Sequence, residues 1–118
     1  MHELSLCQNV IDIVNEAAAR EGLVRVSRVR LEIGAGAAVE PDALEFCFPL
    51  LARDTRLEGA ELVIEIVALR ARCRSCGTEF APDSQVAGCP QCGAFGPEFI
   101  AGREMRVASF DGSAKPKG

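Results

Sequence analysis

The chain has 118 residues, of which 48% are hydrophobic, and it carries a formal net charge of −4. This length suits one ordinary domain, or a small domain that carries a metal-stabilised module. No run approaches the roughly 18 apolar residues that a membrane-spanning helix needs, and the first residues lack the basic and apolar segments of a signal peptide, so the sequence predicts a cytoplasmic protein without a membrane segment.

The first predicted element is a helix that ends near Gly22. Its apolar residues recur at three- and four-residue spacing, which places them on one face. They are Cys7, Val10, Ile11, Val14, Ala17 and Ala18. Because Cys7 lies on this face, we expect it to be a small core residue. A strand follows at Leu23–Ile33, and its alternation changes phase near Ser27, which suggests a β-bulge.

A second helix is predicted from Pro41, whose fixed φ suits the first turn. Its inner face consists of Leu44, Cys47, Phe48 and Leu51. Pro49 falls inside this pattern, where it removes one backbone hydrogen bond and clashes with the preceding turn. The sequence therefore predicts a kink at Pro49, or a helix that breaks there and restarts.

Two more strands are predicted, at Ala60–Leu69 and Met105–Phe110. The second of them returns after a cysteine-rich segment, which makes that segment an insertion in a small sheet. The predicted fold class is α+β: a three-stranded sheet with two helices, plus an inserted zinc-ribbon module. We expect residues 1–70 with 98–112 to form an α/β domain, residues 71–97 to form a zinc-binding domain, and residues 113–118 to be a disordered tail.

Two Cys-x-x-Cys pairs, Cys73/Cys76 and Cys89/Cys92, are separated by 12 residues. Each pair presents two sulfurs from one turn, and four thiolates complete the closed tetrahedral site that structural Zn²⁺ prefers. Gly77 and Gly93 supply the left-handed residue that follows each pair. Two disulfides are the alternative, and the lack of a secretory segment favours zinc. The site has no open position, so the sequence predicts a structural zinc ion.

His2 is the only histidine in the chain. The α-amine of Met1, the amide nitrogen that joins the first two residues, and Nδ1 of His2 can close fused chelate rings on one metal. Such nitrogen coordination suits square-planar Ni(II) or Cu(II). The fourth donor is either the next backbone amide or the carboxylate of Glu3. Met1 is expected to remain, because the aminopeptidase that removes initiators accepts only small second residues.

Met1-His2-Glu3-Leu4 at the start of an amphipathic helix, the acidic-apolar second helix, and the two Cys-x-x-Cys pairs followed by a short strand resemble the HypA/HybF family of hydrogenase-maturation nickel chaperones. The resemblance covers nearly the whole chain, Met1 to Phe110. It implies that Met1, His2 and Glu3 bind nickel, which makes residues 1–70 with 98–112 a nickel-binding domain. It implies structural zinc on the four cysteines. It also implies work with a nickel-handling GTPase that loads the large subunit of [NiFe]-hydrogenase.

Two other classes of function compete with a transient nickel carrier. An enzyme is disfavoured because the sequence pairs no nucleophile with a base and leaves no open zinc position. A zinc-ribbon adaptor for nucleic acid or transcription machinery needs a basic surface, but the charges between residues 71 and 97 sum to zero. We therefore expect no nucleic-acid partner, and a homodimer is left open.

Overall fold

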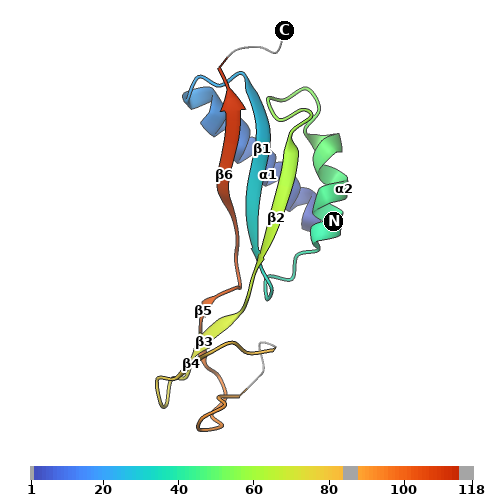
Figure 1. Ribbon diagram of the computed structural model, residues 1–118. Helices are drawn as coiled ribbons and strands as arrows, with labels where there is room; N and C mark the ends of the chain where they lie inside the picture. Colours follow the sequence, from blue (N-terminus) through green and yellow to red (C-terminus); the bar gives the residue numbers. More distant parts are fainter. Residues whose placement is uncertain (1, 84–87, 115–118) are drawn as a thin grey trace. The chain divides into compact units, whose positions relative to one another are not determined.

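The computed structural model describes residues 2–83 and 88–114, without the side chain of His2 (Figure 1). The elements in chain order are α1 (His2–Arg20), β1 (Arg25–Gly34), α2 (Pro41–Leu51), β2 (Glu61–Val67), β3 (Arg70–Arg72), β4 (Glu79–Phe80), β5 (Glu98–Ala101) and β6 (Met105–Ser113). None of the described helices has the length and apolar content that crossing a bilayer requires. The strands form two three-stranded sheets, in the orders β2-β1-β6 and β4-β3-β5. The predicted α+β fold with two helices and an inserted cysteine module is confirmed.

Packing divides the chain into two compact units. Unit 1 consists of Met1–Leu31, Val39–Ile64 and Val107–Gly118, and it contains both helices. Unit 2 consists of Glu32–Ala38 and Glu65–Arg106, and it contains the cysteine pairs. The functional domain boundaries given above are a separate assignment and stay a prediction.

Unit 1 has an aliphatic core between the two helices and the central strand β1 (Figure 1). Most of its fully buried side chains come from the apolar faces that the sequence predicts, and Cys7 is among them at 2% exposure, whereas Leu57, in the turns between α2 and β2, was not predicted. The others include Ile11, Val14, Val26, Val29, Leu31, Leu44 and Leu57. Fully burying a side chain of this size contributes about 1.5–3 kcal/mol, so these residues supply most of the stability of unit 1.

The predicted phase change in β1 is present. Val26 and Val29 are both buried, and the two residues between them, Ser27 and Arg28, are both exposed. Beyond Val29 the strand returns to regular alternation. A strand can keep both apolar sets on the core side only if it gains one residue between them.

Of the two alternatives predicted at Pro49, the break is wrong, and the kink stays a prediction. Helix α2 is continuous from Pro41 to Leu51, with Pro49 inside it. Pro49 lacks the N–H that would donate to the carbonyl of Glu45, but Leu44 and Phe48 on the same helix are buried, and the Ala52 N–H still donates to the Phe48 carbonyl at 2.9 Å. The helix therefore ends normally after the proline.

Two predicted strand boundaries are corrected as well. The strand predicted at Ala60–Leu69 ends at Val67, and β3 begins separately at Arg70. The last strand is longer than predicted and reaches Ser113, whose carbonyl accepts a 2.9 Å hydrogen bond from the Val24 N–H. Pairing with this distant segment extends β6 into the predicted tail. The end of that tail, residues 115–118, lies outside the described residues.

In unit 2, two backbone segments approach each other closely at Gly34 and Gly36 on one side and Gly102 on the other. The Gly34 N–H donates to the Glu104 carbonyl, and the Gly36 N–H donates to the Gly102 carbonyl, both at 2.8 Å. A Cβ on Gly102 would lie 2.6 Å from Leu69 Cα, and the φ of Gly102 is +89°. Only glycine fits both the space and the conformation. This crossing precedes the second sheet, from which the cysteine turns project.

Candidate metal centres

The two Cys-x-x-Cys pairs form two turns with the same hydrogen-bond pattern. In each turn the backbone N–H of the first cysteine donates to the carbonyl of the residue that follows the glycine. The backbone N–H of the glycine donates to the carbonyl of the first cysteine. The donor–acceptor pairs are Cys73–Thr78 (2.8 Å), Gly77–Cys73 (3.0 Å), Cys89–Ala94 (2.9 Å) and Gly93–Cys89 (2.8 Å). The φ values of Gly77 and Gly93 are +77° and +78°, so both glycines occupy the left-handed region as predicted.

The four sulfur atoms lie within 4.8 Å of one another. The Sγ atoms of Cys73 and Cys92 are 3.5 Å apart, and those of Cys76 and Cys89 are 3.7 Å apart. A Zn–S distance of about 2.3 Å in a tetrahedron places its sulfurs about 3.8 Å apart. A disulfide needs about 2.05 Å, and all four cysteines are free. The geometry fits one four-coordinate metal ion and excludes the two-disulfide alternative.

The acidity of these thiols differs across the cluster. The hydroxyl of Thr78, 3.2 Å from the sulfur of Cys76, and the Thr78 backbone lower the pKa of Cys76 to about 6. The Cys76 backbone N–H lowers the pKa of Cys73. The backbone N–H of Ala94 lowers the pKa of Cys92, but interactions with the neighbouring sulfurs and burial outweigh it and raise this pKa to about 11.

The acidity of each of these thiols depends on its neighbours, because the sulfur atoms lie close together. The pKa values of Cys73 and Cys76 are both lowered, and a thiolate at Cys73, whose sulfur is 3.5 Å from that of Cys92, opposes the ionisation of Cys92. A divalent cation removes that opposition, because each thiolate then faces two positive charges. The first cysteine of each pair is buried and the second is exposed. The four donors are all sulfur and leave no open position, which fits structural zinc.

The predicted nickel residues are only partly described. Met1 and the side chain of His2 lie outside the described residues. The backbone of His2 begins α1, and Glu3 lies in its first turn. The carboxylate Oε2 of Glu3 accepts a 3.3 Å hydrogen bond from the backbone N–H of Glu40, the residue that precedes α2. The first turn of α1, next to the predicted nickel residues, therefore contacts the backbone at the start of α2.

Two residues near these centres were not identified from the sequence. Thr78 acts on Cys76, and its position two residues after the second cysteine of a metal turn is a usable signal. Glu40 contacts Glu3 through its backbone, across 37 positions of sequence. Backbone donors carry no sequence signal, so this contact could only be found in the structure.

The arginines of β3 are paired with carboxylates. Glu79 lies 3.1 Å from Arg72 and 3.5 Å from Arg70, and Glu98 lies 3.7 Å from Arg72. Arg72 and then Arg70 lower the pKa of Glu79, as paired charges do. Strand β3 therefore offers no unpaired arginine to a phosphate backbone, which agrees with the neutral charge balance of the segment.

The comparisons with known proteins identify the family of the chain. The family model described as "Hydrogenase/urease nickel incorporation, metallochaperone, hypA" matches residues 1–112. The chain belongs to the HypA family. The resemblance inferred from Met1-His2-Glu3 and the cysteine pairs is thus confirmed, and the family's description is that of a metallochaperone and not of an enzyme.

Curated members of the HypA family match the chain along nearly its full length. The hydrogenase maturation factor HypA of Geobacter metallireducens is 48% identical over 111 residues, which cover 94% of this chain and 98% of that protein. The hydrogenase maturation factor HybF of Klebsiella pneumoniae is 41% identical over 112 residues, which cover 95% and 99%.

Solved structures of the family share the fold. The solution structure of the Ni metallochaperone HypA from Helicobacter pylori matches with a TM-score of 0.72, 22% sequence identity, and coverage of 96% of this chain and 98% of that one. A second solution structure of HypA protein matches with a TM-score of 0.69 and 24% identity, covering 98% of each chain.

Proposed function

We propose that this protein is a nickel metallochaperone that binds Ni²⁺ at its amino terminus and delivers it for assembly of the [NiFe]-hydrogenase active site. The observation that carries the proposal is the HypA family match over residues 1–112, which includes both predicted metal centres. A carrier needs a site that holds its cargo and can release it, and it needs a stable scaffold. The amino terminus meets the first need and the cysteine cluster meets the second.

Cys73, Cys76, Cys89 and Cys92 hold a structural zinc ion in this proposal. The spacing of their sulfurs and the matched turns support it. Structural zinc contributes about 10–16 kcal/mol of folding free energy in isolated peptides, which a segment this small cannot obtain from apolar burial alone.

Nickel binds to nitrogen donors from Met1, His2 and Glu3. Helix α1 begins at His2, so the first amide N–H groups have no acceptor inside the helix. Deprotonating them for a metal therefore breaks no helical hydrogen bond, and the positive end of the helix favours the resulting negative charge. The carboxylate of Glu3 already accepts the Glu40 N–H, which favours the Glu3 amide as the fourth donor. Protons compete for every one of these donors, so nickel release becomes easier as the pH falls.

The partners follow from the same function. Nickel bound at an exposed chain end can pass to another protein by docking and ligand exchange. We infer that the chain works in the cytoplasm with a nickel-handling GTPase and with the large subunit of [NiFe]-hydrogenase. It performs no catalysis of its own, since its metal ions serve as cargo and scaffold.

A complementation experiment tests this function. Hydrogenase activity is measured in a hydrogenase-producing strain that lacks its own copy of this protein. The parent chain should restore activity without added nickel. A chain with one extra residue before Met1 should fail, because its α-amine becomes an amide, and millimolar nickel in the medium should rescue it. Full activity of the extended chain without nickel would contradict the proposed site.

A further inference from the structure

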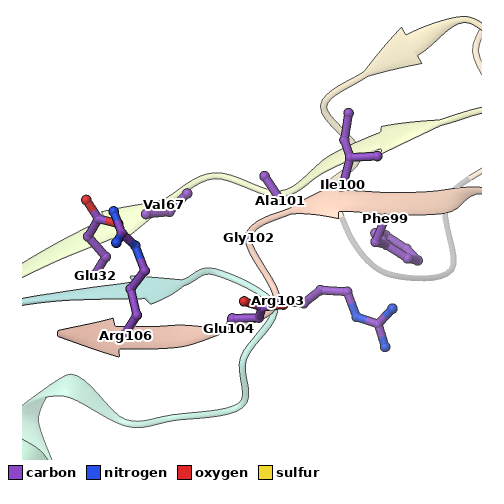
Figure 2. A pocket seen from close by; sticks show the side chains of 9 residues that line it. All are labelled: Glu32, Val67, Phe99, Ile100, Ala101, Gly102, Arg103, Glu104 and Arg106. Atoms are coloured by element: carbon purple, nitrogen blue, oxygen red, sulfur yellow. The ribbon is translucent and has the colours of Figure 1, made fainter. Parts of the chain in front are cut away.

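Unit 2 contains a groove of about 560 Å³, which is within the roughly 300–1,000 Å³ typical of ligand pockets (Figure 2). Its lining includes part of β5 and four charged residues; these are Phe99, Ile100, Ala101, Glu32, Glu104, Arg103 and Arg106. All of these residues belong to unit 2. The groove holds none of the cysteines and none of the residues assigned to nickel.

The groove follows the free edge of strand β5. In the sheet order β4-β3-β5 this strand is terminal, so only one of its sides is paired. Phe99 and Ile100 point to opposite faces of β5, and both line the groove (Figure 2). Because residues from both faces of β5 line it, the groove lies beside the unpaired edge of the strand. The unpaired N–H and C=O groups of such an edge are a template for one more strand.

A guanidinium without a carboxylate partner stands beside this edge. Arg106 is neutralised by Glu32 at 2.7 Å. Arg103 has no ion pair among the described residues, and its guanidinium carbon lies 4.9 Å from the centre of the Phe99 ring. The arginine side chain runs beneath that ring in Figure 2. Stacking on an aromatic ring fixes a guanidinium while its N–H groups remain available for bidentate contact with a carboxylate.

We propose that this groove binds an extended acidic segment of a partner protein, which adds as a strand to β5 and places a carboxylate on Arg103. Main-chain hydrogen bonds to Phe99–Ala101 supply sequence-independent affinity. The acidic side chain sets the register, because only one position of the segment faces Arg103. The ring of Phe99 and the side chain of Ile100 meet the apolar neighbours of that position on the two faces. This surface is separate from both metal centres.

A peptide array tests the proposal with the zinc-loaded full-length protein. The peptides have seven residues on a valine-threonine background, with Glu, Gln or Lys placed at each position in turn. We expect about tenfold tighter binding of peptides with Glu at one central position than of their Gln counterparts. Arg103→Gln should abolish that preference, and Phe99→Leu should reduce it several-fold. Arg53→Gln removes the same charge from an exposed turn of unit 1 and should change nothing.

Two further measurements separate strand addition from simple charge attraction. N-methylation of alternate amides in the best peptide should weaken its binding at least tenfold, and the peptide should slow hydrogen exchange at those amides within Phe99–Ala101 that face the unpaired edge of β5. The proposal is overturned if Glu gives no advantage over Gln, or if the advantage survives Arg103→Gln. It is also overturned if free glutarate competes as well as the peptide, since that outcome means a small-anion site. If the Phe99→Leu protein no longer binds zinc, its fold is disturbed and it is set aside. The Arg103→Gln variant, which changes an exposed side chain, then decides the question alone.

Discussion

The hydroxyl of Thr78 offers a direct test of how the cysteine cluster binds its metal. It lies 3.2 Å from the sulfur of Cys76 and is the largest cause of the lowered pKa of that thiol, about 6 against an ordinary 9.0. Thr78→Val keeps the shape of the side chain and removes the hydrogen bond. The pKa of Cys76 then rises, and at neutral pH a bound zinc ion must displace a proton that the parent protein has already lost.

The size of the effect follows from proton competition. At pH 7 a thiol of pKa 6 is about nine-tenths ionised, and one of pKa 9 is about one-hundredth ionised, so complete loss of the shift would weaken zinc binding about ninetyfold. The Thr78 backbone sustains part of the shift. We therefore expect a loss of roughly tenfold to a few tens, within the 10–100-fold typical of outer-shell changes. Near pH 9 the Cys76 thiol is at least half ionised in both the parent protein and the variant. The difference between their zinc affinities should therefore shrink to about twofold.

Zinc affinity is measured by competition with a chromogenic chelator at intervals from pH 6.5 to 9.5. Ser75→Ala is the matched control, because it changes a neighbouring hydroxyl that makes no hydrogen bond among the described residues. It should leave the affinity unchanged at every pH. A Thr78→Val loss of equal size at all pH values, or no loss at pH 7, would refute the reasoning.

Three further predictions concern the two units. Cys89→Ser should abolish stoichiometric zinc and free the remaining thiols, while circular dichroism retains the helical signal of unit 1; bound zinc at one per chain would contradict the four-cysteine site. Leu44→Ala should lower the free energy of unfolding in urea by about 2–5 kcal/mol, because Leu44 is 1% exposed in the core, and a loss under 1 kcal/mol would place it elsewhere. In the zinc-loaded protein, Cys47 should react with iodoacetamide at pH 8 long before Cys7. Burial, and then the charge of Cys47, raise the pKa of Cys7 to about 11. Equal reaction rates of the two cysteines, measured by mass spectrometry, would contradict the burial of Cys7.

Features set by neighbours in the sequence could be predicted well. The cysteine turns are local, because Cys73 and Gly77 close them within five residues. The apolar face of α1 and the phase change at Ser27 follow from spacing alone. The metal cluster then followed from the chemistry of four thiols, and the HypA resemblance added the nickel hypothesis.

Features set by distant partners could not be predicted. The last strand extends to Ser113 because Val24 supplies a hydrogen bond from the other end of the chain. The break at Pro49 was misjudged because the continuity of α2 depends on the burial of Leu44 and Phe48, which tertiary packing decides. The contact between Glu3 and the Glu40 backbone requires the packing of α1 against α2. The groove beside β5 depends on which strand of the second sheet is left at the edge.

The measurement that tests the central claim most directly is calorimetric titration of the zinc-loaded protein with Ni²⁺ near pH 7.5. The parent chain should bind one nickel ion. His2→Ala should bind none at that affinity, because an amine and amides without the imidazole rarely lose their protons to Ni²⁺ near neutral pH. The zinc content should remain one per chain in both proteins. Stoichiometric nickel binding by His2→Ala at the parental affinity would contradict the amino-terminal site and, with it, the proposed route of nickel delivery.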